Sequence, residues 1–264
     1  MMTNPTPQIS ATALQRAIPL WRWLMIIGHV ISGVGILCFL FPFLNRQKKD
    51  QKIQQWCARL LAIFHLKLVV RGAERLTKTP YLMISNHISW IDIHVINSFK
   101  PIRFVAKSEV KSWPIFGWMA TQLGTVFIRR DSTRQARLVV EQMAEVLKSE
   151  SVCIFPEGTS TSGGSVLPFK HGLFEAALVA QTPVFPLAVQ YFSTETGLRS
   201  EATAFIGEMG LLESMANILK SRHLQARLTV LEPFPYGSQE VPDRKHLANY
   251  CHEAISRIVD DPNM

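Results

Sequence analysis

The sequence predicts an α/β fold, a mostly parallel twisted sheet flanked by helices, preceded by an N-terminal membrane-anchoring helical segment. Short apolar runs alternate with helix-like patterns from residue 66 onward, which is typical of parallel sheets covered on both faces. An almost uninterrupted apolar run precedes them, and polar residues suited to acid–base chemistry follow several of the predicted strands. A chain of 264 residues suffices for one such domain with an appendage.

The apolar run from Leu24 to Leu44 is long enough to cross a bilayer, because a helix of this length covers about 30 Å. Trp21 and Trp23 precede it as interfacial anchors, and basic residues follow it at 46, 48, 49 and 52. This asymmetry predicts a protein of the inner (cytoplasmic) membrane whose following domain lies on the cytoplasmic side. The run is too long and begins too late for a cleaved signal peptide. Its glycines and Pro42 leave a second possibility open, a kinked helix embedded in one leaflet.

Residues 1–65 are thus predicted to form the membrane-associated segment, with an apolar helix at about 18–44 and an amphipathic helix at about 50–65. The basic stretch near 46–50 is expected to join the two helices. In the second helix, one face is apolar and faces either lipid or the following domain; it carries Ile53, Trp56, Leu60, Leu61 and Phe64.

Residues 66–264 are predicted to form one α/β domain. The strand-like runs are Leu66–Val70, Tyr81–Ile84, Ile102–Ala106, Thr125–Ile128, Val152–Phe155, Val184–Gln190 and Arg227–Leu231. Helical patterns cover Ile91–Ile96, Gln135–Lys148, Phe174–Ala180 and Arg244–Val259. The stretch Thr196–Leu224 has the least clear pattern, and we interpret it as a possible insertion.

The formal net charge of +8 favours acidic partners such as anionic lipid headgroups, phosphorylated substrates or an acidic carrier protein. Nucleic acid is not expected, because the basic residues are scattered and no binding motif is present. The four cysteines (Cys38, Cys57, Cys153 and Cys251) are far apart, without metal-ligand spacing. We therefore expect no metal site and no disulfide framework, and a reducing compartment.

His87 and Asp92 lie five residues apart, directly after the strand Tyr81–Ile84 and at the start of a helical pattern. The carboxyl ends of strands are where open α/β sheets bind their ligands. The spacing suits a general base and the acid that orients it. By itself the pair is equally well explained by a histidine with a local hydrogen bond and an aspartate that caps a helix.

Two further strand ends carry polar residues. Arg129 and Arg130 follow one strand and can present a guanidinium fork to phosphate, although solvated arginines are the simpler explanation of such a pair. After another strand come Glu157, Gly158 and Thr159, where a carboxylate can accept hydrogen bonds from hydroxyls. A plain turn with a solvated Glu157 is the alternative.

Taken in order, these segments resemble the membrane-bound glycerolipid acyltransferases, specifically the bacterial 1-acyl-glycerol-3-phosphate (lysophosphatidate) acyltransferase family. The resemblance covers about residues 70–189. The matching blocks are N-H-x-x-x-x-D (Asn86, His87, Asp92), a glycine followed by F-I-x-R (Gly124, Phe127, Ile128, Arg130), F-P-E-G-T (Phe155 to Thr159) and a proline-containing apolar strand (Pro183 to Pro186).

The resemblance implies transfer of an acyl group from a thioester to the free hydroxyl of a lysophospholipid, first of all 1-acyl-glycerol-3-phosphate. His87 would be the general base and Asp92 its orienting acid, and Arg130 with Arg129 would hold the acceptor's phosphate. The remaining expected substrate-binding residues are Asn86, Phe127, Glu157, Gly158, Thr159 and Lys107. A solvated lysine at a strand end explains Lys107 equally well, and Lys170 is similarly ambiguous. No cofactor is implied; acyl-CoA or acyl-ACP is the co-substrate, with acyl carrier protein and membrane lipids as partners.

Two departures concern the acceptor. Many members with a phosphatidate product have an acidic residue where this chain has Arg129, and Arg where it has Ser160. The stretch from Thr159 to Phe169 also resembles acyltransferases of lyso-ornithine lipid, so an O-acyltransferase for that or another lysolipid is the alternative.

Two alternatives belong to other functional classes. A non-catalytic membrane-binding module would not need the full set of His87, Asp92, Arg130 and Glu157. A lipid hydrolase would need a nucleophile elbow, and the sequence has no G-x-S-x-G.

Overall fold

The computed structural model describes residues 18–77, 79–128, 133–236 and 243–261. Within these residues, seven strands form one sheet in the order β1-β7-β6-β2-β5-β3-β4. The strands are β1 (Leu66–Arg71), β2 (Leu82–Ser85), β3 (Arg103–Lys107), β4 (Val126–Ile128), β5 (Val152–Ile154), β6 (Val184–Ser193) and β7 (Leu224–Val230). Each one overlaps a strand predicted from the sequence.

The sheet is mixed, and the prediction of a mostly parallel sheet is confirmed. Strand β2 pairs in parallel with both β5 and β6, and β3 pairs in parallel with β5 and β4. Strand β1 is parallel to β7, whereas β6 and β7 are antiparallel. The four neighbours β2, β5, β3 and β4 therefore all end at the same edge of the sheet.

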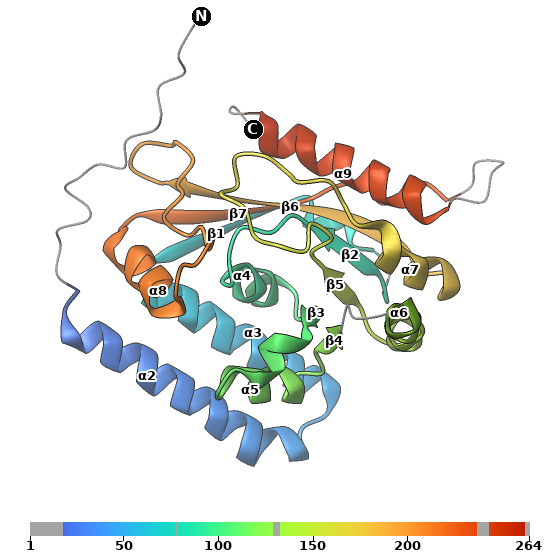
Figure 1. Ribbon diagram of the computed structural model, residues 1–264. Coiled ribbons are helices and arrows are strands. Elements are labelled where there is room, and N and C mark those ends of the chain that lie inside the picture. Colours follow the sequence, from blue (N-terminus) through green and yellow to red (C-terminus); the bar gives the residue numbers. More distant parts are fainter. Residues whose placement is uncertain (1–17, 78, 129–132, 237–242, 262–264) are drawn as a thin grey trace, which may run out of the picture.

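Helices cover both faces, as alternating strands and helices require (Figure 1). On one face, α3 (Arg46–Ile63), α4 (Asp92–Phe99) and α8 (Leu211–Lys220) pack against apolar side chains of the central strands. On the other face lie α6 (Thr133–Leu147), α7 (Glu175–Val179) and α9 (Arg244–Asp260). The patterns predicted near α4, α6, α7 and α9 are confirmed.

The N-terminal part is a helical hairpin formed by α2 and α3, in which α2 lies on the outside of α3 (Figure 1). Helix α2 (Leu20–Gly35) continues through a π-helical turn, η1 (Ile36–Leu40), and a 3₁₀ turn, η2 (Phe41–Phe43), before α3. The basic residues expected to join the helices instead form the first turn of α3, because the side chain of Asn45 accepts a hydrogen bond from Lys48 N (3.0 Å) and caps the helix.

Helix α2 packs closely on α3 because Gly33 lets it approach. A Cβ added at Gly33 would lie 2.8 Å from the indole nitrogen of Trp56, closer than Cβ contacts normally allow. Trp56, one of the residues of the predicted apolar stripe of α3, therefore faces protein and not lipid. In the described chain, Leu20–Phe43 is the one helical stretch long and apolar enough to cross a membrane, judged by length and composition alone.

Two short segments complete this side of the molecule. Between β3 and β4 lie η4 (Ser108–Ser112) and α5 (Phe116–Gln122), which the sequence analysis did not predict. The segment without a clear pattern contains α8, which joins the core through Ile218 and Leu219. Just before α8, Phe205 N donates to Ile88 O (3.0 Å), so this segment packs directly on the loop after β2.

Candidate active site

The loop between β2 and α4 is wrapped around the carboxylate of Asp92, the first residue of α4. Its Oδ2 accepts hydrogen bonds from Ile88 N (2.7 Å) and Ser89 N (2.9 Å). Both donors belong to the loop that carries His87. The Asp92 side chain is completely buried, so this local turn brings a charged group into the protein interior with partners already in place.

The same oxygen contacts His87. The distance from Asp92 Oδ2 to His87 Nδ1 is 2.9 Å, and the His87 side chain is 22% exposed. Because a carboxylate only accepts hydrogen bonds, Nδ1 carries the proton of this pair and Nε2 is left with a lone pair. No hydrogen bond within the described part of the chain engages Nε2. The structure thus brings together the two residues that the sequence analysis paired, in the geometry of a base and its orienting acid.

Tyr191 of β6 also binds Asp92. Its hydroxyl donates to Asp92 Oδ1 at 2.6 Å, and its side chain is 1% exposed. Burial, and next the charge of Asp92, raise the pKa of Tyr191 well above its ordinary value, so the phenol stays protonated and remains a donor. Tyr191 is not among the site residues predicted from the sequence, because the predicted strand ends at Gln190. The available signal was the two-residue period, since Tyr191 lies on the same face as Leu187 and Val189.

Glu157 lies beside His87 but contacts the backbone. Its Oε1 accepts from His87 N (2.6 Å), its Oε2 accepts from Leu167 N (2.9 Å), and the residue is 3% exposed. Burial raises the pKa of Glu157, and the two backbone hydrogen bonds oppose that rise. The carboxylate therefore holds the His87 loop and the 157–167 segment together, and the expected contact of Glu157 with an acceptor hydroxyl stays a prediction.

Asn86 has a similar position. Its side-chain amide donates to Val189 O (3.0 Å) and its oxygen accepts from Val189 N (2.8 Å), in the manner of a strand neighbour. The pair is buried and fixes the start of the His87 loop on β6. Nothing about this geometry directs Asn86 toward a substrate, so its predicted binding role also stays a prediction.

Phe155 forms one wall of the site. Its ring stacks on the imidazole of His87 at a centroid distance of 4.2 Å and an interplanar angle of 18°, and it stacks in turn with Phe104 of β3 (5.9 Å). Gly158 follows in a left-handed conformation (φ 74°) in which other residues are strained, and Gly158 N closes the turn on Phe155 O (3.1 Å). Thr159 is exposed at the same turn.

The other predicted residues lie at the end of β3, within β4 and before η5 where the structure describes them. Lys107 is exposed at the end of β3, and Phe127 of β4 lies 5.9 Å from the ammonium group of Lys111. Lys170 is exposed at the start of η5 (His171–Phe174), where its N donates to Pro156 O (3.0 Å). Arg129 and Arg130 lie outside the described residues.

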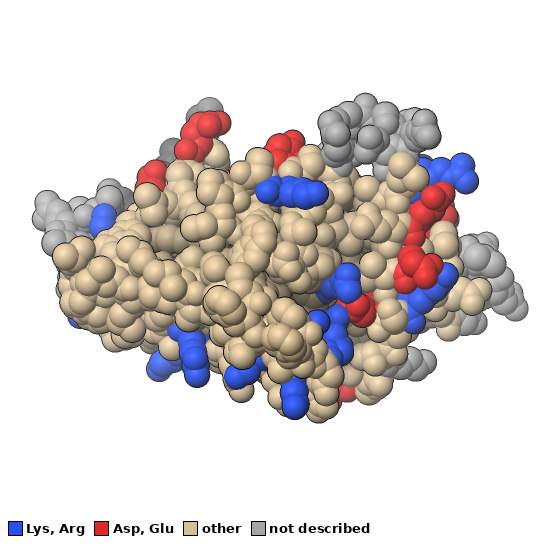
Figure 2. Space-filling view, turned by 90° about the horizontal axis from the view of Figure 1, so that it is seen from below, with Lys and Arg blue, Asp and Glu red and all other residues tan. Residues whose placement is uncertain are grey.

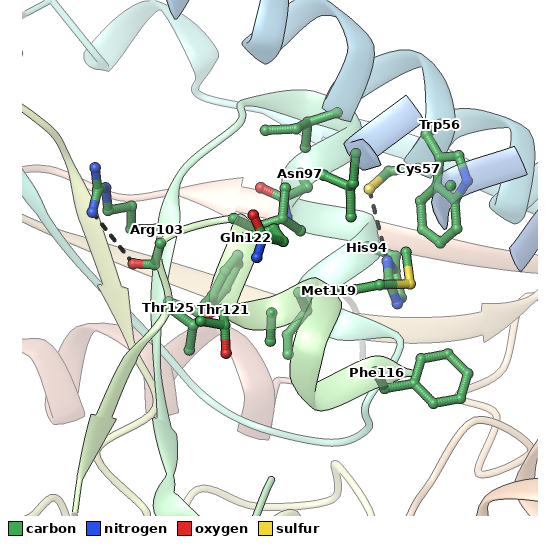
Figure 3. Close-up of a pocket in the computed structure, with 18 of the residues that line it drawn as sticks. Trp56, Cys57, His94, Asn97, Arg103, Phe116, Met119, Thr121, Gln122 and Thr125 are labelled. Atoms are coloured by element: carbon green, nitrogen blue, oxygen red, sulfur yellow. Dashed lines mark hydrogen bonds between the residues drawn. The ribbon is translucent and has the colours of Figure 1, made fainter. Parts of the chain in front are cut away.

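A mostly apolar cavity of about 520 Å³ lies beside this loop (Figure 3). Trp56, Cys57 and His94 line one side of it, and Arg103 and Thr125 the other. Trp90 and Phe104 are also in its wall, so the cavity reaches the loop and the aromatic stack that hold His87. Burial lowers the pKa of His94 to about 4, so the cavity contains a neutral imidazole at physiological pH.

The described residues contain no group of three or more His, Cys, Asp or Glu side chains placed to bind a metal ion. The geometry of His87 and Asp92 suits proton removal from a hydroxyl, which needs no metal.

Comparisons with known proteins point to one family. A profile of the Acyltransferase family matches residues 67–190. The chain is 33% identical over 243 residues to a lyso-ornithine lipid O-acyltransferase from Pseudomonas aeruginosa, covering 89% of this chain and 91% of that one. It is 30% identical over 251 residues to a 1-acyl-sn-glycerol-3-phosphate acyltransferase from Neisseria meningitidis, covering 95% and 94%.

A solved structure has the same fold. It is the crystal structure of the 1-acyl-sn-glycerophosphate (LPA) acyltransferase PlsC from Thermotoga maritima, with a TM-score of 0.66 and 23% sequence identity over 91% of this chain and 92% of that one. With its sequence relatives and its fold in agreement, the chain is an acyltransferase and belongs to the glycerolipid acyltransferase family that includes the 1-acyl-sn-glycerol-3-phosphate and lyso-ornithine lipid acyltransferases.

Proposed function

We propose that this protein transfers an acyl group from a thioester, acyl-CoA or acyl-ACP, to the free hydroxyl of a lysolipid, with 1-acyl-glycerol-3-phosphate as the first candidate acceptor. The observation that carries the proposal is the contact of His87 Nδ1 with the buried Asp92 carboxylate, which leaves Nε2 without a hydrogen-bond partner in the described chain. Trp90 and Ile93, on either side of the Ile91–Asp92 pair, line a mostly apolar cavity. A cavity of about 520 Å³ lies within the usual range of pockets that bind small-molecule ligands.

In the proposed reaction, His87 Nε2 takes the proton of the acceptor hydroxyl as its oxygen attacks the thioester carbonyl. The tetrahedral intermediate then expels the thiolate as the carbon–sulfur bond breaks. The imidazolium returns its proton to the sulfur, so the products are an ester and a free thiol. Asp92 keeps Nδ1 protonated and stabilises the imidazolium between the two steps. The lipid supplies the nucleophile, so no acyl-enzyme is needed.

A phosphate on the acceptor would be held by Arg130 with Arg129, which follow β4 in the sequence. Lyso-ornithine lipid is the second candidate acceptor. It is favoured by Ser160, where many phosphatidate-producing members have Arg, and by the relative from Pseudomonas aeruginosa. The positive net charge suits both donors, since coenzyme A carries phosphates and acyl carrier protein is acidic.

We further propose that α2 lies in the plane of one leaflet instead of crossing the bilayer. One face of α2 and of the turns that continue it is buried against the rest of the protein along its whole length, from Arg22 through Gly33 to Phe41. Arg22 donates to Leu219 O (3.0 Å) in α8, so even the first turn of α2 is attached to the α/β domain. A helix packed in this way cannot have lipid on all sides, whereas a one-sided apolar face suits a membrane surface.

The opposite face of α2 and of the η1 turn carries the exposed apolar side chains, including Ile31 (65%) of α2 and Phe39 (75%) of η1. Figure 2 shows this side of the molecule as a wide area without charges, with Lys and Arg along one edge. Trp113, Ile115 and Trp118, next to and within α5, are exposed as well. Basic residues beside an apolar face suit anionic lipid headgroups, so we place this face on the cytoplasmic leaflet of the inner membrane.

Replacing His87 by Ala should lower acyl transfer about 10²- to 10⁴-fold, because the variant has no base for the acceptor hydroxyl. The measurement is turnover with labelled acyl-CoA or acyl-ACP on purified, folded protein. His223→Ala is the matched control, since that exposed histidine pairs with Glu195 away from the site. Near-normal turnover by the His87 variant would remove the proposed mechanism.

Glu157→Gln distinguishes a residue that holds the His87 loop through the backbone from one that contacts the acceptor. Gln offers one acceptor oxygen where Glu157 serves two backbone N–H groups, so either His87 N or Leu167 N loses its partner and the two segments are no longer held together. We expect kcat to fall about 10-fold or more with little change in KM for the acceptor. A rise chiefly in the acceptor KM would instead support the contact with the acceptor that the sequence predicts.

Arg130→Ala should raise KM for 1-acyl-glycerol-3-phosphate about 10- to 100-fold, the size expected when hydrogen bonds to a charged group are lost. Lyso-ornithine lipid, which lacks phosphate, should be affected much less. Arg137→Ala is the control, because Arg137 is exposed and pairs with Glu141 within α6. An equal loss on both acceptors would point to a structural role for Arg130.

High salt alone should leave the protein in the membrane fraction, and detergent should release it. Replacing Ile31 and Phe39 together by Asn should lower partition into anionic vesicles at least about tenfold, since fully burying one such side chain is worth about 1.5–3 kcal/mol. The control pair is Leu138→Asn with Val179→Asn, which are 53% and 61% exposed on α6 and α7.

A protease digestion distinguishes an α2 that lies in one leaflet from one that crosses the bilayer. With α2 in one leaflet, an N-terminal tag and the catalytic domain should be digested by protease from the same side of sealed inverted vesicles. Digestion of the domain with protection of the tag would show that the helix crosses the bilayer.

A further inference from the structure

Two tyrosines are almost completely buried in the same core cluster, and their hydroxyls have different surroundings. Tyr81 is 0% exposed and Tyr191 is 1% exposed. The Tyr191 hydroxyl donates to Asp92 Oδ1 at 2.6 Å. The Tyr81 hydroxyl has no hydrogen bond of normal geometry in the described chain, although Ser151 is near enough to oppose slightly the rise in its pKa that burial causes. Of these two buried phenols in the described chain, Tyr191 is the one whose hydroxyl makes a hydrogen bond of normal geometry.

The hydrogen bond from the Tyr191 hydroxyl affects the orientation of the Asp92 carboxylate. Asp92 Oδ2 is the oxygen that meets His87 Nδ1, and it also accepts from Ile88 N and Ser89 N. All three donors come from the loop before α4, so they fix one oxygen relative to that loop. The second oxygen, Oδ1, is held by Tyr191, which is 99 residues away in the sequence. With both oxygens held, the plane of the carboxylate is set, and Oδ2 stays directed at the imidazole.

Tyr191 belongs to a strand that already holds the other end of this loop. Val189, two residues earlier on β6, exchanges two hydrogen bonds with the Asn86 side chain (3.0 and 2.8 Å). Residues two apart in a strand point to the same face, and Val189 and Tyr191 lie in one core cluster with Ile88 and Ile91. Strand β6 therefore holds the loop at its start through Asn86 and at its end through Asp92.

We propose that Tyr191 is a positioning residue for acyl transfer: its hydroxyl orients the Asp92 carboxylate, and through Asp92 it keeps His87 in the tautomer that can accept a proton at Nε2. The proposal rests on the proposed function of His87 and Asp92. Tyr191 itself is 1% exposed, so in this proposal it acts through Asp92 without contacting substrate.

Tyr191→Phe tests this with the loss of one oxygen atom, and Tyr81→Phe is the matched control. In Tyr191→Phe, kcat should fall about 10- to 100-fold, by analogy with the partners that orient metal-binding histidines, whose loss has effects of this size. KM for the acyl donor and for the lysolipid should stay within about twofold, because neither substrate contacts the phenol. Tyr81→Phe should retain the kcat of the unmodified protein, since its hydroxyl makes no hydrogen bond of normal geometry in the described chain.

A measurement without turnover accompanies the kinetics. Protein with ¹⁵N-labelled histidine, in detergent micelles, should give NMR correlations of a His87 protonated at Nδ1, assigned by their absence in His87→Ala. In Tyr191→Phe these signals should change toward a mixture of tautomers, whereas Tyr81→Phe should leave them in place. Thermal unfolding of each variant identifies any loss of fold, and the kinetics are compared below the lowest transition.

Three outcomes would overturn the proposal. The first is a Tyr191→Phe variant with normal kcat and unchanged His87 signals, even if it melts earlier, because the phenol would then only stabilise the fold. The second is an equal loss of kcat in Tyr81→Phe, which would indicate packing and not the hydrogen bond. The third is a fully active His87→Ala variant, which would remove the mechanism itself. Inactive His87→Ala with unaffected Tyr191→Phe would remove the role of Tyr191 alone.

Discussion

The buried carboxylate of Asp92 is the group on which the rest of the site depends. A completely buried carboxylate is unfavourable unless hydrogen bonds replace its water, and removing one partner of a buried charged pair typically costs about 3–5 kcal/mol. Asp92 meets this requirement with two backbone amides, the His87 imidazole and the Tyr191 hydroxyl. Satisfying the charge therefore dictates the shape of the loop from residue 87 to residue 91 and the position of the histidine. The stability of this part of the fold and its chemistry have the same physical cause.

The sheet topology explains why distant segments meet at this loop. Strands β2, β5, β3 and β4 are parallel neighbours, so the residues that follow them gather at one edge. Glu157, after β5, reaches the backbone of His87, after β2, because those two strands are adjacent. On the other side of β2, β6 supplies Val189 and Tyr191. The loop is thus held from both neighbouring strands, and Glu157 and Tyr191 act on opposite members of the His87–Asp92 pair.

Much of this arrangement could be predicted from the sequence, and the exceptions have physical reasons. The strands were recognisable because buried parallel strands are short continuous apolar runs, and His87 with Asp92 because they follow such a run. The engagement of Glu157 by two backbone amides could not be predicted, because Leu167 N is brought there by a loop whose path has no local pattern. Tyr191 resembles any aromatic residue in a strand until its partner, 99 residues earlier, is known. Helix α5 was missed because a helix of seven residues has too little periodicity to detect.

The hairpin of α2 and α3 separates the face that we propose for lipid contact from the cavity beside the His87 loop. Gly33 and Leu37 of the hairpin line the cavity from one side, and Ile93 and His94, which directly follow Asp92, line it from the other. Arg46 at the start of α3 and Arg103 of β3 both pair with Glu150, which ties the hairpin to the sheet at the charged end of the cavity. One side of the hairpin thus carries the face that we place on lipid, and its other side lines the cavity. Asp92, which contacts His87, directly precedes Ile93 and His94 in the cavity wall. An acyl chain in this cavity would lie between the membrane surface and His87, which is the arrangement that esterification of a lipid held in the same leaflet requires.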